Sequence, residues 1–258
     1  MNYIGIDIGS TCAKTVVLNE NKELVHEFVQ PTGWSSVDTA NAIKNSLLEK
    51  EINPEEEICV ATGYGRISVP YANKMVTEIT CHGKGAIWIH GSQNLNIIDI
   101  GGQDTKVICM EDGFVKDFVM NDKCSAGTGR FLEVMANTLS VAPDELCNMA
   151  ANGSNTTISS MCTVFAESEV ISLIGRGEKK ENIAYAVVDS VVRKVASQTS
   201  RLDLKHAPIY LTGGLCDCTY IKEALSSALQ AEVLSGKDGR YAGAIGAALC
   251  AIEIGRKG

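Results

Sequence analysis

The sequence contains no Cys-x-x-Cys motif, although ten of its 258 residues are cysteines. Its nearest approach to that motif is Cys216-Asp217-Cys218. Structural zinc sites and ferredoxin-type iron–sulfur sites usually take ligands from such closely spaced pairs. Neither kind of site is therefore encoded in one short segment. Cysteines that bind a metal cluster in this protein must come from distant positions or from two chains.

Basic clusters, aromatic–basic stripes and long apolar runs are also missing. The net charge of -8 argues against a nucleic-acid-binding surface. No apolar run approaches the ~18 residues that a membrane-spanning helix needs, so we expect no membrane partner. Met1 leads directly into the strand-like segment Tyr3–Ile6 without a basic region or a cleavage site, so we expect no signal peptide. Together these absences predict a cytoplasmic protein, whose cysteines should stay out of disulfides.

The composition is that of a folded globular protein. Hydrophobic residues make up 45% of the chain and charged residues 21%, far from the balance of a disordered segment. A chain of 258 residues can form one large domain or two lobes, each with an ample core.

Two segments share a pattern of strand, tight turn and strand, with Asp-x-Gly at the bend. The first segment, Ile4–Leu18, contains Asp7, and the second, Leu95–Ile108, contains Asp99. One Asp-x-Gly is typical of a structural turn. Two copies, each at the start of one half of the chain, predict a duplicated α/β fold with lobes at 1–94 and 95–258.

The two glycine turns are suited to phosphate binding if they face each other, because glycine lets a ligand approach backbone N–H groups closely. Asp7 and Asp99 would then hold Mg²⁺ through water and orient an attacking water. Ser10, Thr11 and Lys14 are polar groups within reach of the first turn. Lys14 is equally consistent with a solvated position on the returning strand.

Apolar periodicity predicts further elements. It predicts a helix over 37–48, capped by Ser35 or Ser36, and a long helix over 183–195 that ends near residue 202. The strand 209–215 ends at Gly213-Gly214, which suits either close approach of a ring or sugar or helix packing. The small-residue segment 241–249 predicts a closing helix that packs tightly, between the lobes or back on the first lobe.

Two cysteines precede helical patterns. Cys124 opens the Gly-rich stretch that leads to Phe131, and Cys162 is followed by the apolar run that starts at Val164. At a helix N-terminus, N–H groups and the helix dipole stabilise a thiolate or another anion. The alternative is that both are core cysteines that act as small hydrophobic residues.

Several motifs resemble those of known families. Asp-x-Gly-Ser-Thr near the start, Ile-Asp-Ile-Gly-Gly-Gln-Asp in the middle and Thr-Gly-Gly late in the chain resemble the phosphate and adenosine motifs of the superfamily of acetate and sugar kinases, heat-shock chaperones and actin. The segments 121–131 and 162–169 resemble the ATPase activators of 2-hydroxyacyl-CoA dehydratases, relatives of the ATPase subunits of benzoyl-CoA reductase. The segments 61–66 and 78–82 also match that family, so the resemblance covers essentially the whole chain.

The resemblance implies duplicated actin-like (ribonuclease H-like) lobes with mixed sheets flanked by helices. It implies a homodimer that bridges one [4Fe-4S] cluster, to which each chain gives Cys124 and Cys162. It implies ATP-driven transfer of one electron from ferredoxin or flavodoxin to an iron–sulfur dehydratase or reductase, with Mg²⁺ as the nucleotide's metal. Asp7, Asp99 and Gln103 match catalytic positions. The positions that match nucleotide contacts are Gly9, Ser10, Thr11, Cys12, Ala13, Lys14, Gly101, Gly102, Gln103, Asp104, Glu133, Gly213, Gly214, Arg240 and Gly243.

Some residues depart from the family pattern, and other functions stay open. Cys12 replaces a small uncharged residue in the first phosphate loop, Arg240 stands where relatives carry Gln, and Cys216 and Cys218 follow the Gly-Gly turn. The partner enzyme could equally be a benzoyl-CoA reductase type or a double-cubane-cluster protein. A small-molecule kinase of the same superfold, or a nucleotide sensor without chemistry, would need the phosphate loops but neither Cys124 nor Cys162.

Overall fold

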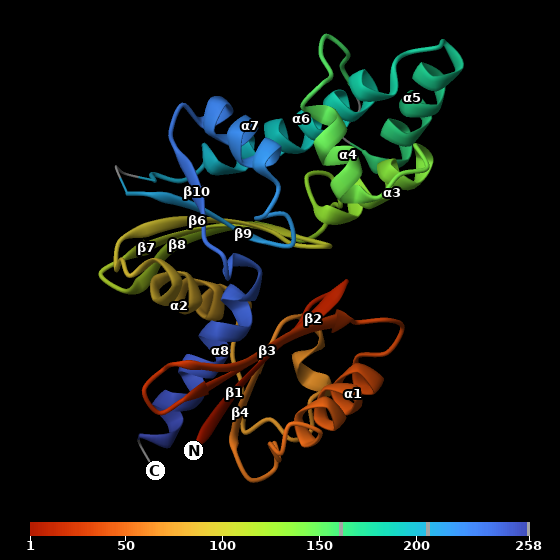
Figure 1. The fold of residues 1–258 in the computed structure, drawn as a ribbon. Coiled ribbons are helices and arrows are strands. Elements are labelled where there is room, and N and C mark those ends of the chain that lie inside the picture. The colour runs from red at the N-terminus through yellow and green to blue at the C-terminus, as the bar shows by residue number, and fades with distance from the viewer. Residues whose placement is uncertain (160–161, 205–206, 257–258) are drawn as a thin grey trace. The chain divides into compact units, whose positions relative to one another are not determined.

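The computed structural model describes residues 1–159, 162–204 and 207–256 (Figure 1). These residues form two compact units, both discontinuous in sequence. The first unit comprises the described residues of Met1–Asn94, Met110–Lys116 and Asp238–Gly258, and the second those of Leu95–Cys109 and Asp117–Lys237. Within the described ranges, no helix has the length and apolar character needed to cross a membrane.

The first unit contains a mixed five-stranded sheet in the order β3-β2-β1-β4-β5. Strand β1 pairs antiparallel with β2 and parallel with β4. The strands are β1 (Asn2–Ile8), β2 (Cys12–Asn19), β3 (Leu24–Pro31), β4 (Ile58–Thr62) and β5 (Lys74–Met75). The helices are α1 (Ser36–Leu48), α2 (Glu78–His90) and α8 (Ala242–Gly255), with the short 3-10 turns η1 (Tyr64–Ser68) and η2 (Gly239–Tyr241).

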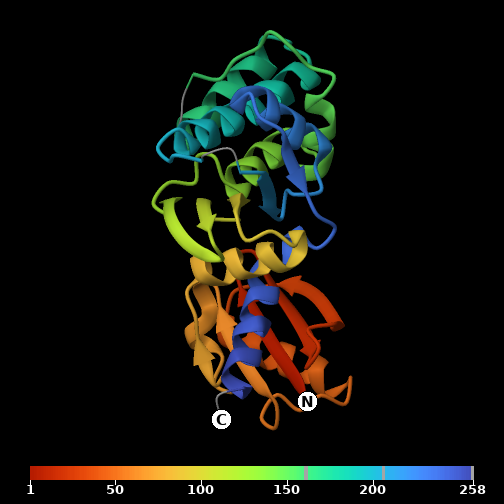
Figure 2. The same ribbon diagram turned by 90° about the vertical axis from the view of Figure 1, so that its left-hand side faces the viewer.

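Alternate residues of β1 serve two separate cores. Ile4 and Ile6 belong to the cluster that contains Ile43 of α1, whereas Tyr3 belongs to the cluster that contains Ala248 of α8. Because side chains alternate across a strand, the sheet is covered by α1 on one face and by α8 on the other. Figure 2 shows α8 running along the strands of this sheet.

The closing helix packs within the first unit. A Cβ atom on Gly5 of β1 would collide with the backbone of Ala244 and Ala248, and one on Gly246 would collide with the backbone of Cys81. Helix α8 therefore approaches β1 and α2 backbone to backbone, which only small residues allow. The tight packing is as the sequence predicts, and its partners are β1, β4 and α2 of the first unit.

The helix predicted at 37–48 is confirmed as α1. Ser35 is its N-cap, and the Ser35 side chain accepts a hydrogen bond of 3.2 Å from the backbone N–H of Asp38. Ala40, Ile43 and Leu47 are buried at helical spacing. The cap and the apolar face thus agree with each other, which explains why this element could be predicted locally.

The second sheet has the order β10-β9-β6-β7-β8 and belongs to the second unit, apart from the residues of β7 and β8 within Met110–Lys116. Read in reverse, this order is the same as that of the first sheet: β6 takes the central place of β1, with β7 and β8 on one side and β9 and β10 on the other. Strand β6 pairs parallel with β9, and β9 pairs parallel with β10. The strands are β6 (Leu95–Ile100), β7 (Thr105–Glu111), β8 (Phe114–Asn121), β9 (Ile209–Gly213) and β10 (Val233–Ser235).

Helices form the larger part of the second unit's core. They are α3 (Gly129–Thr138), α4 (Pro143–Ala150), α5 (Thr163–Gly175), α6 (Lys180–Thr199) and α7 (Thr219–Leu229). Phe131 and Met135 of α3 share one cluster with Ile183 and Val187 of α6. The long helix predicted over 183–195 is confirmed as α6, and its apolar stripe is core.

Candidate functional site

The turn between β1 and β2 holds Asp7 in a restricted space. Asp7 is 5% exposed, and the N–H of Gly9 donates to the carbonyl of Cys12 at 3.1 Å, which closes the turn. A Cβ atom on Gly63 would lie 2.6 Å from Asp7 Oδ1, and one on Gly243 would lie 2.7 Å from Asp7 Oδ2. Two glycines therefore leave room for the two carboxylate oxygens. The sequence between Asp7 and Cys12 alone does not reveal this requirement.

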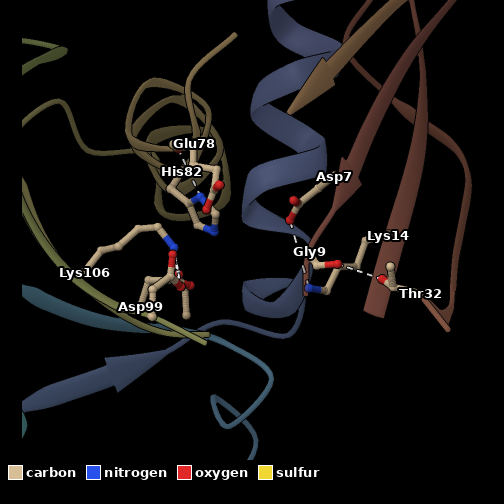
Figure 3. Close-up of polar contacts among 10 residues, drawn as sticks. Asp7, Gly9, Lys14, Thr32, Glu78, His82, Asp99 and Lys106 are labelled. Carbon is tan, nitrogen blue, oxygen red and sulfur yellow. Dashed lines mark hydrogen bonds and ion pairs between the residues drawn. The ribbon is translucent and has the colours of Figure 1, made fainter. Parts of the chain in front are cut away.

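Thr32 ties the first turn to the end of β3. Its hydroxyl donates to the carbonyl of Gly9 at 2.7 Å, and its N–H donates to the carbonyl of Thr11 at 2.9 Å. Lys14 Nζ lies 4.0 Å from Asp7 Oδ2, as Figure 3 shows. Lys14 therefore lies beside the carboxylate.

The equivalent turn of the second unit holds a buried lysine between two carboxylates. Lys106 Nζ lies 2.8 Å from Asp104 Oδ1 and 3.3 Å from Asp99 Oδ2 (Figure 3). All three residues are at most 4% exposed. Asp99 Oδ1 also accepts a hydrogen bond of 2.9 Å from the hydroxyl of Thr212. The lysine offsets the repulsion between two carboxylates that water does not screen.

The two units repeat the same local construction around their aspartates. Gly63 has φ of 87° and Gly213 has φ of 88°, values that favour glycine. A Cβ atom on Gly213 would lie 2.9 Å from Asp99 Oδ1, as one on Gly63 would crowd Asp7. In the sheets, Asp7 is opposite Thr62 and Asp99 is opposite Thr212. Each unit thus places an aspartate against a Thr-Gly pair at the end of the neighbouring parallel strand.

The turn of the second unit is joined directly to α3. The N–H groups of Gly129 and Arg130 donate to the carbonyls of Gly101 and Gly102, each at 2.8 Å. The first N–H groups of a helix have no partner within it, so they are available for such bonds. The hydroxyl of Thr105 adds a third bond, of 2.6 Å, to the carbonyl of Gly127.

Cys124 and Cys162 lie in adjoining segments of the second unit. The hydroxyls of their following residues, Ser125 and Thr163, are hydrogen-bonded at 2.8 Å. Both cysteines are exposed, so the alternative of core cysteines is wrong. Asn121 holds the first segment in shape, because its amide donates to the carbonyl of Cys124 at 2.8 Å.

The prediction that both sulfurs stand at helix N-termini is right for one cysteine and wrong for the other. Cys162 is the N-cap of α5. Helix α3, in contrast, begins at Gly129 with Thr128 as its N-cap, and Thr128 donates through both its N–H and its hydroxyl to Ser125. These bonds close a turn ahead of the helix, so Cys124 precedes α3 rather than capping it.

The remaining predicted nucleotide positions differ in their surroundings. Ser10, Thr11, Gln103 and Gly214 are exposed at their turns. Glu133 is paired with Arg130 at 2.8 Å on the surface of α3. Cys12, Gly101 and Gly102 are partly exposed, whereas Ala13 is buried.

Arg240 and Gly243 lie in the first unit, in η2 and at the start of α8. A Cβ atom on Gly243 would lie 3.0 Å from Cε1 of His82, a 7% exposed residue of α2. His82 Nδ1 is 3.0 Å from the carbonyl of Glu78 (Figure 3). The space at Gly243 therefore separates the Asp7 carboxylate from the His82 ring.

Sequence reasoning missed the residues that support the predicted ones. These are Thr32, His82, Thr105, Lys106 and Thr212. Lys106 gave one available signal, because it stands two residues after Asp104, where the chain enters a strand and alternate residues share a side. The other four act through contacts between distant segments, for which a single sequence has no local pattern.

The geometry is that of a duplicated α/β protein. Each of its two units has the same strand order and presents an aspartate at a glycine turn beside a Thr-Gly strand end. The second unit also presents two exposed cysteines. Among the described residues, no group of three or more His, Cys, Asp or Glu side chains is arranged to hold a metal ion.

Comparison with known proteins gives the family. Residues 4–251 match the BadF/BadG/BcrA/BcrD ATPase family, and the chain belongs to it. It is 39% identical to the (R)-2-hydroxyglutaryl-CoA dehydratase activating ATPase of Acidaminococcus fermentans, over 98% of each chain.

Solved structures agree. Component A of the (R)-2-hydroxyglutaryl-CoA dehydratase of Acidaminococcus fermentans matches with a TM-score of 0.92 and 39% identity, over 99% of each chain. The activator of the 2-hydroxyisocaproyl-CoA dehydratase of Clostridium difficile, solved with bound ADPNP, matches with a TM-score of 0.92 and 35% identity, over 100% of this chain and 96% of that one. The fold is that of the actin-like ATPases, with two mixed sheets flanked by helices, as the sequence predicts.

Proposed function

We propose that this protein is an ATP-dependent activator of a 2-hydroxyacyl-CoA dehydratase. It would pass one electron at a time from ferredoxin or flavodoxin to an iron–sulfur enzyme, as a cytoplasmic homodimer that shares one [4Fe-4S] cluster. The observation that supports the redox part most strongly is the hydrogen bond between Ser125 and Thr163, which keeps the exposed Cys124 and Cys162 in adjoining segments.

The proposed ligands fit the chemistry of such a cluster. Iron–sulfur clusters prefer thiolate ligands and commonly take four. One chain offers two exposed cysteines in neighbouring segments, and a two-fold axis would double that number. Val164 and Phe165 lie two and three residues after Cys162 and are 67% and 66% exposed, so this surface is suited to being covered by a second chain. When bound, the cluster would supply a one-electron carrier.

For the nucleotide, we propose that the glycine turn of each unit takes part in binding ATP and Mg²⁺. Asp7 and Asp99 would orient Mg²⁺ and the attacking water, and Gln103 would assist at the exposed second turn. Lys14 would neutralise phosphate charge beside Asp7. The backbone N–H groups of Gly9–Lys14 and Gly101–Asp104 would contact phosphate, and Gly213 and Gly214 would contact the adenosine.

Glu133, Arg240 and Gly243 are the remaining residues of the proposed nucleotide site, and their surroundings in the structure differ. Glu133 must leave Arg130 to reach a ribose, since the two are paired in the structure. Arg240 and Gly243 both belong to the first unit, so both would act from that unit.

The contacts of α3 suggest how nucleotide state would reach the cysteines. The carbonyls of Gly101 and Gly102 accept from the first two N–H groups of α3, and Thr105 bonds Gly127 in the Cys124 segment. A nucleotide that shifts the second turn would therefore move α3 and the Cys124 segment together. Interactions that differ between two nucleotide states are what such coupling requires.

Anaerobic purification with iron analysis tests the redox part. We expect brown protein with about four irons per dimer, and an EPR signal after dithionite reduction that changes when ATP is added. Cys124→Ala and Cys162→Ala should each remove the iron and leave ATP binding intact. Cys218→Ser is the matched control, since it alters a partly exposed cysteine outside this pair and should keep its iron.

Two results would count against the proposal. Iron that survives both Cys124→Ala and Cys162→Ala would exclude these residues as ligands. Colourless protein that transfers phosphate from ATP to a sugar or an organic acid would favour the kinase alternative instead. Measuring reduction of benzoyl-CoA reductase-type and double-cubane-cluster proteins beside a 2-hydroxyacyl-CoA dehydratase would separate the possible partners.

A further inference from the structure

The aspartate of each glycine turn lies on the central strand of its sheet. In the second unit, β6 lies between β9 and β7, so Asp99 has a neighbouring strand on each side. It takes one partner from each. The hydroxyl of Thr212 on β9 donates to Asp99 Oδ1 at 2.9 Å, and the ammonium group of Lys106 on β7 lies 3.3 Å from Asp99 Oδ2 (Figure 3). Both oxygens of this carboxylate are therefore held.

Lys106 is itself held in place by Asp104. The Lys106 ammonium lies 2.8 Å from Asp104 Oδ1, and a Cβ atom on Gly101 would collide with the same oxygen. The carbonyl of Asp104 also accepts a hydrogen bond of 2.9 Å from the N–H of Gly101. Asp99, Asp104 and Lys106 are each at most 4% exposed. The charged end of the lysine is thus fixed by the turn that it supports.

The equivalent residues of the first turn are arranged differently. Lys14 takes the place of Lys106, because each lysine stands seven residues after the aspartate of its turn. The Lys14 ammonium lies 4.0 Å from Asp7 Oδ2, which is too far for a hydrogen bond, and its side chain is 18% exposed. Thr62 on β4 takes the place of Thr212, yet its buried hydroxyl makes no hydrogen bond to Asp7. The first carboxylate is therefore held less firmly than the second.

One position explains how the two lysines differ. Five residues after the aspartate, the second turn has Asp104 and the first turn has Cys12. Cys12 offers no carboxylate that would fix Lys14. The Lys14 ammonium can therefore turn toward an incoming anion, whereas Lys106 cannot leave without stranding two buried carboxylates.

We propose that Lys106 and Thr212 are positioning residues for ATP hydrolysis, which hold the Asp99 carboxylate in one orientation. In the first turn, Asp7 and Lys14 are the pair that changes partners when nucleotide binds. This inference rests on the function proposed above, because it divides the work of the same site between the two turns.

The physical reason is preorganisation. A carboxylate that orients a reacting group contributes most when it does not have to reorganise during the reaction. Without the Thr212 hydroxyl, the Asp99 carboxylate could rotate about its Cβ–Cγ bond, although it would keep its charge and its contact with Lys106. The orientation needed in the transition state would be lost and nucleotide binding would be kept. A fall in kcat at unchanged affinity is the expected signature.

The test compares two substitutions of Thr212 in the full-length protein. Thr212→Val keeps the shape of the side chain and removes the hydroxyl, whereas Thr212→Ser keeps the hydroxyl and removes the methyl group. Phosphate release from ATP in the presence of Mg²⁺ gives kcat, and calorimetric titration with ADPNP gives Kd. We expect kcat of Thr212→Val to fall about 10- to 100-fold with Kd nearly unchanged. Thr212→Ser should keep most of the activity, which a role in packing alone would not predict.

Thr199→Val is the matched control. The Thr199 hydroxyl is also buried and donates to the carbonyl of Val195 at 2.9 Å, within α6 and outside the proposed site. This variant loses a buried hydrogen bond of the same length and should keep its kcat. Lys14→Gln should show the opposite behaviour to Thr212→Val, with weaker ADPNP binding and a smaller change in kcat.

Lys106→Met should lower kcat as Thr212→Val does, at temperatures where circular dichroism shows it to be folded. If this variant does not fold, the two Thr212 variants decide the result.

Four outcomes would overturn the inference and leave the proposed ATPase function intact. They are a normal kcat in Thr212→Val, an equal loss in Thr212→Val and Thr212→Ser, an equal loss in Thr199→Val, and an unchanged ADPNP affinity in Lys14→Gln. An unmodified protein that binds ADPNP but never hydrolyses ATP would instead overturn the proposed function and this inference together.

Discussion

Replacing Lys106 by Met should destabilise the protein far more than an ordinary loss of an ion pair. Lys106 is 2% exposed and lies 2.8 Å from Asp104 and 3.3 Å from Asp99. Without the ammonium group, two carboxylates would remain buried beside each other, with Thr212 still bonded to only one of them. Removing one partner of a buried ion pair costs about 3–5 kcal/mol.

The chain offers a matched control in Lys116→Met. Lys116 also pairs with a carboxylate, that of Glu111 at 3.3 Å, but its side chain is 66% exposed. Exposed pairs contribute at most about 1 kcal/mol because water screens them and both side chains lose freedom. The same substitution in two environments therefore isolates the effect of burial.

Urea unfolding followed by circular dichroism measures both variants, with nucleotide and magnesium absent throughout. We expect a lower midpoint at unchanged slope for Lys106→Met, or a fall in Tm of roughly 6–20 °C. Added salt should reduce the small loss of stability in Lys116→Met and leave the loss of stability in Lys106→Met nearly unchanged. As the pH falls far enough to protonate Asp99 and Asp104, the Lys106→Met deficit should shrink.

A loss below about 1 kcal/mol for Lys106→Met, equal to that of Lys116→Met, would refute the reasoning. A double-mutant cycle with Asp104→Asn gives a second check. Because the two groups touch, their effects should be non-additive by more than about 0.5 kcal/mol. Additive effects would mean that the buried pair does not act as a unit.

Three further predictions concern the first unit and the α3 connection. Gly243→Ala would place a Cβ atom 2.7 Å from Asp7 Oδ2 and so displace this carboxylate. We expect ATP turnover to fall about 100-fold, while circular dichroism shows that the variant is folded. An unchanged kcat would contradict this prediction. Burial lowers the pKa of His90 to about 4. The unfolded state therefore binds a proton at higher pH than the folded state, and the free energy of unfolding should fall as the pH drops from 6.5 to 4. In urea titrations, His90→Asn should reduce this pH dependence, and an equal pH dependence in both proteins would count against the prediction. Thr105→Val removes the 2.6 Å bond to the Gly127 carbonyl and should cost about 1–3 kcal/mol; if α3 carries the nucleotide signal, the ATP-dependent EPR change should weaken although iron content stays normal.

Much of the local structure followed from the sequence. Helix α1 was predictable because its cap at Ser35 and its buried Ile43 and Leu47 report the same element at short range. The turns after Asp7 and Asp99 were predictable because Asp-x-Gly between apolar strands has few other conformations. The family motifs around Cys124 and Cys162 were also visible as continuous segments.

The surroundings of these residues were not predictable in the same way. The position of Cys124 ahead of α3 depends on Gly101 and Gly102, whose carbonyls take the first N–H groups of the helix. The side of β1 that α8 covers depends on the missing side chain of Gly5. Both outcomes depend on contacts between segments far apart in the chain.

The sequence by itself determined the aspartate turns, the Cys124 and Cys162 motifs and the family, because each is written in a few consecutive residues. The tertiary structure alone decided that Lys106 lies between two buried carboxylates and that α8 packs against Gly5 of β1. The physical reason is that burial and contact change the energy of a charged group, and both exist only once distant segments pack together.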